Sequence, residues 1–231
     1  MDVGLFIAAS GMVAEQTRQD QLANDLSNAT TPGYKADSSP QHSFGQVLLA
    51  NTRGGVAVGS SVQGVSLGRT FTDLTPAAIT ETGEPLDFAI EGHGFFAVRT
   101  PQGVRYTRNG QFTASASGIL TDANGNSVLS ASGSEVKVPA QGTLGPGAVG
   151  VFELAGVEKQ GQNLYTGTTA GKAEGTVRQG ALESSGVDAA TVMVEMISSL
   201  RSFQSGQQAI QAIGQTLQQA STQVGSLGSG G

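Results

Sequence analysis

Apolar residues recur at intervals of seven positions near both ends of the chain. The first series is Leu5, Met12, Gln19 and Leu26, in which three of the four positions are apolar. The second series, near the end of the chain, is Met196, Phe203, Ile210, Leu217 and Val224. A sustained seven-residue period is typical of helices that pack along other helices. We therefore predict one helix over residues 2–28 and another over residues 188–224. For either helix alone, an ordinary amphipathic helix on its own domain remains the alternative.

The polar positions of the predicted C-terminal helix favour packing on other helices. Between Ser202 and Val224 no residue is charged, and most polar positions are glutamine. A helix solvated on one face usually carries Lys and Glu there. Gly206 and Gly214 each cost about 1 kcal/mol of helix stability relative to alanine. Such a helix is stable mainly when packed, and at about 1.5 Å per residue both helices are long enough to project from a compact domain.

The middle of the chain has the pattern of short β-strands. Residues 95–99, 104–108 and 111–115 are β-branched and aromatic runs, and Pro101-Gln102-Gly103 and Asn109-Gly110 between them favour turns. We predict a mixed, mainly β fold with a hairpin-rich β domain. The predicted segments are an N-terminal helix and turn (1–33), an extended linker with possible edge strands (34–74), the β domain (75–180), and a C-terminal helix with a flexible tail (181–231).

Composition excludes several classes of function. The 231 residues carry a formal charge of -6, and Lys and Arg do not cluster, which argues against nucleic-acid binding. The chain has no cysteine, so disulfides and thiolate chemistry are ruled out. The opening MDVGLFIAASGMVAEQ lacks a basic region and a long apolar run. We therefore predict neither a cleaved signal peptide nor membrane insertion.

No motif commits the chain to catalysis, a cofactor or a metal. Asp122, Asn124 and Asn126 alternate like a calcium loop, but Gly125 stands at the fourth position instead of the sixth, and Gly133 stands where the twelfth position requires a glutamate. A hairpin turn is therefore preferred. His42 and His93 have no ligand partner at a useful spacing. Gly92-His93-Gly94 precedes a strand rather than a helix, which favours a tight turn or close packing over phosphate binding.

Three blocks of the sequence together resemble the bacterial flagellar rod and hook proteins. The first is LANDLSNATTPGYK at 22–35, where a leucine and asparagine pattern runs into Thr-x-Gly-aromatic-Lys, with mild departures at Asp25 and Ser27. The second is LDFAIEGHGFFAVRTPQGVRYTRNGQFTASASGIL at 86–120. The third is QGALESSGVDAATVMVEMISSLRSFQ at 179–204, with Gly186 and Asp188 where asparagines are usual.

The resemblance implies a structural subunit of the basal-body rod, the axle that transmits torque. It implies helical assembly with further copies and with other rod and hook subunits, passage through the flagellar (type III) export apparatus without a cleaved signal, and a place in the flagellum. It also implies that the terminal helices form a coiled-coil-like inner tube with the β domains outside. A distal-rod subunit is preferred, and a proximal-rod subunit is nearly as well supported.

This resemblance and the seven-residue period together predict the assembly interface. The interface positions are Leu5, Met12, Leu22, Asn24, Leu26, Asn28, Met196, Leu200, Phe203, Ile210, Ile213 and Leu217. The turn positions are Thr31, Pro32, Gly33 and Tyr34, where Pro-Gly suits the centre of a type II turn. Our hypothesis is that this turn sets the angle at which the chain leaves the inner helix.

Two rival functions remain at this stage. The first is a soluble β-domain binding protein that oligomerises through its helices and binds a small ligand near Gly92 to Phe96. It predicts a closed oligomer, whereas a rod subunit grows by open, head-to-tail contacts. The second is an enzyme using Asp87 or Glu91 as acid or base, for which the sequence offers only a carboxylate pair beside a turn.

Overall fold

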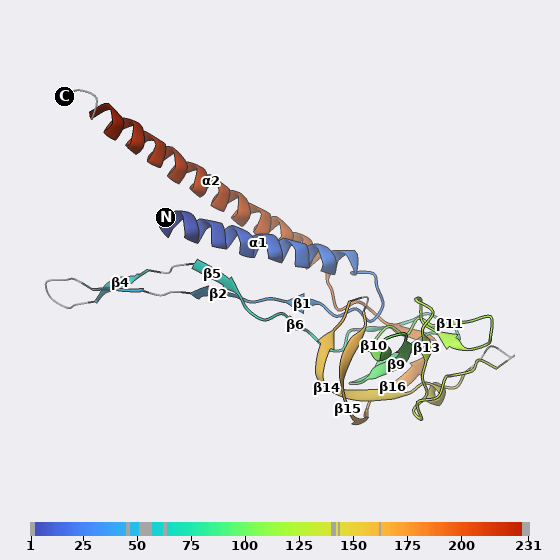
Figure 1. The fold of residues 1–231 in the computed structure, drawn as a ribbon. Coiled ribbons are helices and arrows are strands. Elements are labelled where there is room, and N and C mark those ends of the chain that lie inside the picture. Colours follow the sequence, from blue (N-terminus) through green and yellow to red (C-terminus); the bar gives the residue numbers. More distant parts are fainter. Residues whose placement is uncertain are drawn as a thin grey trace. The chain divides into compact units, whose positions relative to one another are not determined.

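The computed structural model describes residues 3–44, 47–50, 57–61, 64–139, 142, 144–161 and 163–227. The chain divides into two compact units, which Figure 1 places in one view without fixing their relative positions. We call Met1–Leu26, Asp37–Phe71 and Ala190–Gly231 the helical unit. Ser27–Ala36 and Thr72–Ala189 form the β unit. The four segments predicted from sequence remain a prediction, because a division by contacts does not test which segments fold independently.

Two long helices begin and end close to the predicted residues. Helix α1 spans Val3–Ser27 and α2 spans Ala189–Leu227, with Asp188 in the place of an N-cap directly before α2. Alanine, leucine and glutamine are frequent in both helices, and all three residues have high helix propensity. The mixed, mainly β fold with terminal helices is confirmed.

Within the helical unit, α1 and α2 lie side by side and antiparallel (Figure 1). Arg18 Nη2 lies 3.3 Å from Glu195 Oε2, and Ser199 Oγ donates to Glu15 Oε2 at 2.6 Å. Going from the first contact to the second, the residue number falls from 18 to 15 on α1 and rises from 195 to 199 on α2. The two helices therefore run in opposite directions. A continuous coiled coil through further copies remains a proposal.

Three pairs of strands are also described in the helical unit. The pairs are β1 (Asp37–Ser38) with β6 (Phe71–Thr72), β2 (Gln41–Phe44) with β5 (Gly64–Leu67), and β3 (Val47–Ala50) with β4 (Ala57–Ser61). The backbone N–H of Val65 donates to Ser10 Oγ at 3.2 Å, so β5 lies against α1. The structure therefore has more strand pairing here than the edge strands expected from sequence.

The β unit is built around one branched sheet. The strands of the whole β unit are β7 (Ile79–Glu81), β8 (Phe88–Glu91), β9 (Phe95–Thr100), β10 (Gly103–Thr107), β11 (Thr113–Ala114), β12 (Leu120–Thr121), β13 (Ser127–Val128), β14 (Val151–Lys159), β15 (Tyr165–Lys172), β16 (Thr176–Gln179) and β17 (Ala181–Glu183), with a short 3₁₀ helix η1 at Pro146–Ala148. The sheet order is β10-β15-β14-β9-β13-β12-β11, and β9 also pairs with β10. Strands β9, β10, β15 and β14 therefore close into a ring, while β16 pairs with β8 and β17 with β7.

Strand β9 is buried on both of its faces. Phe96 and Val98 belong to one core cluster, and Phe95 and Ala97 belong to the other. Successive side chains of a strand point to opposite faces, so a strand covered on both faces needs a continuous apolar run. That requirement explains the sequence FFAV, and it makes β9 the strand around which the β unit packs.

Most of the predicted turns form, and one has a different role. Strands β9 and β10 are joined at Pro101-Gln102, with Gly103 opposite Thr100. Asp122 accepts hydrogen bonds from the backbone N–H groups of Asn124 and Asn126 at 2.9 and 2.8 Å, which confirms the hairpin turn. Asn109-Gly110 does not close a hairpin, because β11 pairs with β12, and a Cβ on Gly110 would lie 1.6 Å from the carbonyl oxygen of Phe88. Close approach to β8 is the reason for that glycine.

Candidate functional site

The turn after α1 is folded into the β unit. The backbone N–H of Thr31 donates to Asn28 at 3.0 Å, and that of Tyr34 donates to Thr31 at 3.3 Å. Pro32 and Gly33 thus occupy the two central positions, and Gly33 has a φ of +65°, the positive value that a type II turn requires at its third residue. The predicted turn is therefore present, and its last residues, Gly33 and Tyr34, are buried.

Three charged side chains meet beneath this turn. Glu183, at the end of β17, accepts a bond of 2.6 Å from Lys35 Nζ and one of 3.0 Å from Arg108 Nη1. The three side chains are 1 to 2% exposed. We call Lys35, Arg108 and Glu183 the Glu183 cluster. Losing Glu183 would leave two buried positive charges without a counter-ion, and removing one partner of a buried ion pair typically costs about 3 to 5 kcal/mol.

Backbone groups add further hydrogen bonds to the cluster, although the buried Nε of Arg108 has no hydrogen-bond partner among the described residues. Lys35 Nζ also donates to the carbonyl oxygen of Thr75 at 2.6 Å, and Arg108 Nη2 donates to that of Gly92 at 2.8 Å. The backbone N–H of Ala77 donates to Glu183 Oε1 at 2.8 Å. One carboxylate therefore holds the turn after α1, the segment before β7 and the end of β10.

The tip of the β14–β15 hairpin holds the same turn from another direction. The ammonium group of Lys159 lies 4.0 Å from the centre of the Tyr34 ring and donates to the carbonyl oxygen of Lys35 at 2.8 Å. Asn163 donates from Nδ2 to the carbonyl oxygen of Pro32 at 3.1 Å. A cation over an aromatic face is attracted by about 0.5 to 2 kcal/mol. The hairpin tip therefore binds the backbone carbonyl oxygens of Pro32 and Lys35.

The segment that leaves the β unit lies against the segment that comes in. The backbone N–H of Gly33 donates to the carbonyl oxygen of Glu183 at 2.8 Å, and that of Gly186 donates to Tyr34 at 2.8 Å. Ser185 Oγ donates to the carbonyl oxygen of Asn28 at 3.0 Å. We define the neck of the β unit as residues 27–36, 72–77 and 181–189.

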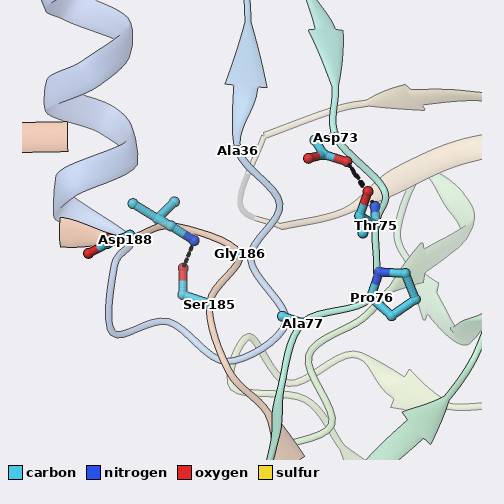
Figure 2. Close-up of a pocket in the computed structure, with 9 residues that line it drawn as sticks. Ala36, Asp73, Thr75, Pro76, Ala77, Ser185, Gly186 and Asp188 are labelled. Carbon is cyan, nitrogen blue, oxygen red and sulfur yellow. Dashed lines mark hydrogen bonds between the residues drawn. The ribbon is translucent and has the colours of Figure 1, made fainter. Parts of the chain in front are cut away.

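A pocket of about 340 Å³ lies at the neck. Figure 2 shows that its lining comes from all three neck segments, including Ala36, Asp73 and Gly186. The pKa of the Asp73 carboxyl is lowered from its ordinary value of 3.8, first by the side-chain hydrogen bond from Thr75 and then by the backbone hydrogen bond from the same residue. The charge of Lys35 adds a smaller lowering, and burial opposes it. This carboxylate orders its own segment by accepting the Thr75 side-chain bond at 2.6 Å.

The predicted interface positions divide by exposure. Leu22 is buried, Asn24, Leu200 and Leu217 are exposed, and the others are half-buried, namely Leu5, Met12, Leu26, Asn28, Met196, Phe203, Ile210 and Ile213. Met12 lies beside Gly206 of α2, so at least this position packs within the subunit. Contact with other copies through the twelve positions stays a prediction.

A second set of apolar side chains is more exposed than the predicted one. Phe6 on α1 is 50% exposed, and on α2 the fractions are 49% for Met193, 67% for Val194 and 53% for Ile197. Met193 lies seven positions before Leu200 and so shares the seven-residue spacing, whereas Val194 and Ile197 lie beside it. Apolar side chains on two adjacent stripes are typical of a helix with neighbours on two sides. The seven-residue spacing selected the first stripe and not the second.

The carboxylates considered for catalysis have structural partners. Asp87 is buried and accepts a bond of 2.7 Å from Thr82 Oγ1, and Glu91 lies 3.4 Å from Arg178. Gly94, in the stretch considered for ligand binding, packs so closely that a Cβ there would lie 2.5 Å from Val151. Among the described residues, no group of three or more His, Cys, Asp or Glu side chains is placed to hold a metal ion. Neither described helix has the length and hydropathy that a bilayer crossing requires.

Sequence reasoning missed the roles of Arg108 and Glu183. Both lie inside the quoted blocks, and Lys35 closes the first block, but the partners are separated by 75 and 148 positions along the chain. The available signal was that charged residues are only 13% of the chain, and that Lys35, Arg108 and Glu183 each lie in a block that resembles the family. The structure brings the three blocks together at one carboxylate.

Comparison with known proteins gives a consistent family. Family models match at residues 5–35 (flagella basal body rod protein), 89–162 (flagellar hook protein FlgE/F/G D1 domain) and 178–223 (flagellar basal body rod FlgEFG protein C-terminal). The flagellar basal-body rod protein FlgG of Bacillus subtilis is 30% identical, covering 93% of this chain and 96% of its own length. The flagellar basal-body rod protein FlgF of Caulobacter vibrioides is 30% identical, over 89% of this chain and 91% of its own length.

Proposed function

The chain belongs to the flagellar basal-body rod protein family, and from that premise we propose that it joins the rod through exposed apolar side chains of its terminal helices. Its partners in this proposal are further copies of itself and other rod and hook subunits. The flagellar export apparatus would deliver it without cleavage. Contacts of this kind repeat along a helical structure because they are head-to-tail and not self-complementary.

The exposed apolar side chains of the two helices carry the proposal. Met193, Val194, Ile197 and Phe6 are each about half exposed or more, although side chains of this kind are usually buried. Fully burying one large apolar side chain contributes about 1.5 to 3 kcal/mol. Because the four lie on long helices, burying them against parallel or antiparallel neighbours needs no change in the β unit. A tube of helices provides such neighbours.

The glutamine-rich half of α2 supports a second step in the proposal. Beyond Gly206, which contacts Met12, most side chains between Gln207 and Ala220 are exposed. This half therefore has little packing within the subunit, and its sequence carries a glycine at position 214. We propose that it becomes fully ordered only on assembly, which would keep free subunits from polymerising before they reach the growing tip.

Two substitutions on α2 test the assembly surface. Ile197→Gln and Leu200→Gln replace exposed side chains, so we expect the free energy of unfolding of the purified chain to change by less than about 0.5 kcal/mol. In cells that depend on the variant gene, we expect loss of swimming and loss of the subunit from purified basal bodies. The control is Val104→Gln, because Val104 is 42% exposed on β10 in the β unit.

The proposal fails if the doubly substituted chain is incorporated into basal bodies at the wild-type level. A wild-type chain that never appears in purified basal bodies would overturn the rod function itself. Limited digestion of the purified monomer tests the ordering step, since we expect the second half of α2 to be removed before the β unit is cut. Equal resistance of both parts would contradict it.

The position along the rod is a finer proposal. We place the chain in the distal rod, with the proximal rod as the alternative, and relatives named FlgG and FlgF both match most of its length. Site-directed crosslinking in basal bodies would identify the neighbours above and below. Crosslinks to hook subunits or to a distal neighbour support the first position, and crosslinks only to the innermost rod subunits support the second.

A further inference from the structure

We propose that the Glu183 cluster is a mechanical clamp that holds the β unit together where force enters and leaves it. The inference rests on the proposed function, because a subunit of a rotating rod must carry load through its backbone. It concerns a different part of the molecule from the apolar helix surfaces.

The chain passes between the helical unit and the β unit at four points. These are Leu26 to Ser27, Ala36 to Asp37, Phe71 to Thr72 and Ala189 to Ala190. On the side of the β unit all four points lie on the neck, residues 27–36, 72–77 and 181–189. Any tension transmitted along the chain between the units therefore reaches the β unit through the neck.

Glu183 belongs to one neck segment and is bonded to the other two. Its side chain binds Lys35 of the first segment and the backbone N–H of Ala77 in the second. Its carbonyl oxygen accepts from Gly33, and it belongs to the third segment itself. Its second carboxylate oxygen binds Arg108, directly after β10. The carboxylate therefore joins the three loaded segments to the central sheet.

Charged hydrogen bonds suit this task better than apolar packing. Apolar contacts are non-directional, so two segments held by them can shift slightly past each other with little loss of contact free energy. Bonds between buried charges have a fixed geometry, and a partly broken cluster leaves desolvated charge behind. The cluster should therefore resist small displacements and open as a unit. Lys159 and Asn163, which hold the first segment from the β14–β15 tip, restrict the same movement.

Hydrogen exchange of the purified full chain, followed by mass spectrometry, tests the clamp without requiring assembly. In Glu183→Gln we expect peptides covering 27–36, 72–77 and 181–188 to exchange at least about tenfold faster while peptides of β9 and β14 keep most of their protection. The matched control is Leu120→Ala, which removes a fully buried side chain of the β-unit core outside the neck. It should speed exchange across the β unit without singling out the neck.

A milder variant covers the case in which Glu183→Gln does not fold. Lys35→Met removes the bonds to Thr75 and Glu183 but leaves Glu183 paired with Arg108. We expect a smaller, still local, increase of exchange at 27–36 and 72–77. If both Glu183→Gln and Lys35→Met change exchange uniformly across the β unit, as Leu120→Ala does, the cluster is ordinary core and the clamp is refuted.

Swimming at raised viscosity tests whether the clamp carries load. We expect cells with Lys35→Met to assemble rods in normal number and to swim in dilute medium, but to lose speed or break rods at least about twofold more than wild type as viscosity rises. Equal behaviour of Lys35→Met and wild type at every viscosity overturns the mechanical role. That result would leave the rod function intact, because assembly is scored separately.

Discussion

A Cβ atom on Gly33 would lie 2.3 Å from the carbonyl oxygen of Arg108, closer than two such atoms can approach. Gly33 belongs to the turn after α1, and Arg108 directly follows β10, so the turn and the central sheet are in backbone contact. The glycine serves two requirements at once. It supplies the positive φ of the turn, and it allows the sheet to approach.

Replacing Gly33 should therefore damage the β unit itself. The turn hypothesis from sequence expects Gly33→Val to impair assembly more than folding, whereas this contact leads us to expect both to suffer. Gly125→Ala is the matched control, because Gly125 has a φ of +81° with nothing within 4 Å of its Cβ position. Gly125→Ala therefore measures only the cost of placing a side chain at a positive φ, which is about 1 kcal/mol.

We expect Gly33→Ala to lower the free energy of unfolding by at least about 2 kcal/mol more than Gly125→Ala does, because overpacking adds to the strain. Urea unfolding followed by circular dichroism measures the difference. Equal losses in the two variants would mean that the turn moves away from Arg108 at little cost. In that case the hypothesis that the turn serves mainly assembly would be favoured again.

The Asp73 carboxylate predicts a small dependence of stability on pH. Its pKa is lowered in the folded chain, first by the Thr75 side-chain hydrogen bond, so the folded state favours the ionised form. Its contribution is therefore complete above the ordinary pKa of 3.8 and is lost as pH falls through the lower folded value. We expect Asp73→Asn to melt below wild type at pH 7, with the two melting temperatures converging below pH 3.8.

The same substitution has an informative control. Asp20→Asn removes an exposed carboxylate on α1, outside the neck. A melting difference for Asp73→Asn that persists unchanged into acid would show that the aspartate acts through its shape rather than its charge. Because Asp73 is exposed, the whole effect should be small.

Local patterns were sufficient to predict the helices and the first strands of the β unit. The seven-residue series placed the helices at 2–28 and 188–224, and they are found at Val3–Ser27 and Ala189–Leu227. Strand β9 was predicted because its aromatic and β-branched residues are consecutive. In each of these cases the information lies within a few neighbouring residues, so no knowledge of distant contacts was needed.

The remaining features depend on distant partners. Strand β15 has glycine or threonine at many positions, and it is held by pairing along its length with β14 and at Tyr165 with β10. Fully buried Lys, Arg and Glu are rare unless paired, and no local pattern predicts which partner will meet Lys35 from 148 positions away. The seven-residue spacing also did not select the exposed side chains of Val194 and Ile197, because they lie beside its positions on α2.

Two glycines of α2 provide a final prediction about the helices. Gly214 has nothing within 4 Å of its Cβ position, whereas a Cβ on Gly206 would lie 2.8 Å from Met12 Cγ on α1. Both substitutions to alanine gain the same intrinsic helix propensity, about 1 kcal/mol. Only Gly206→Ala must also push the two helices apart or force Met12 into another rotamer.

We therefore expect Gly214→Ala to raise the thermal stability of the helical signal at 222 nm and Gly206→Ala to raise it less or lower it. Met12→Ala combined with Gly206→Ala should recover part of the gain, since the smaller side chain makes room for the added methyl group. If Gly206→Ala stabilises the free chain as much as Gly214→Ala, the helices do not pack at Met12 in solution. The pairing of α1 with α2 would then have to be supplied by neighbouring subunits.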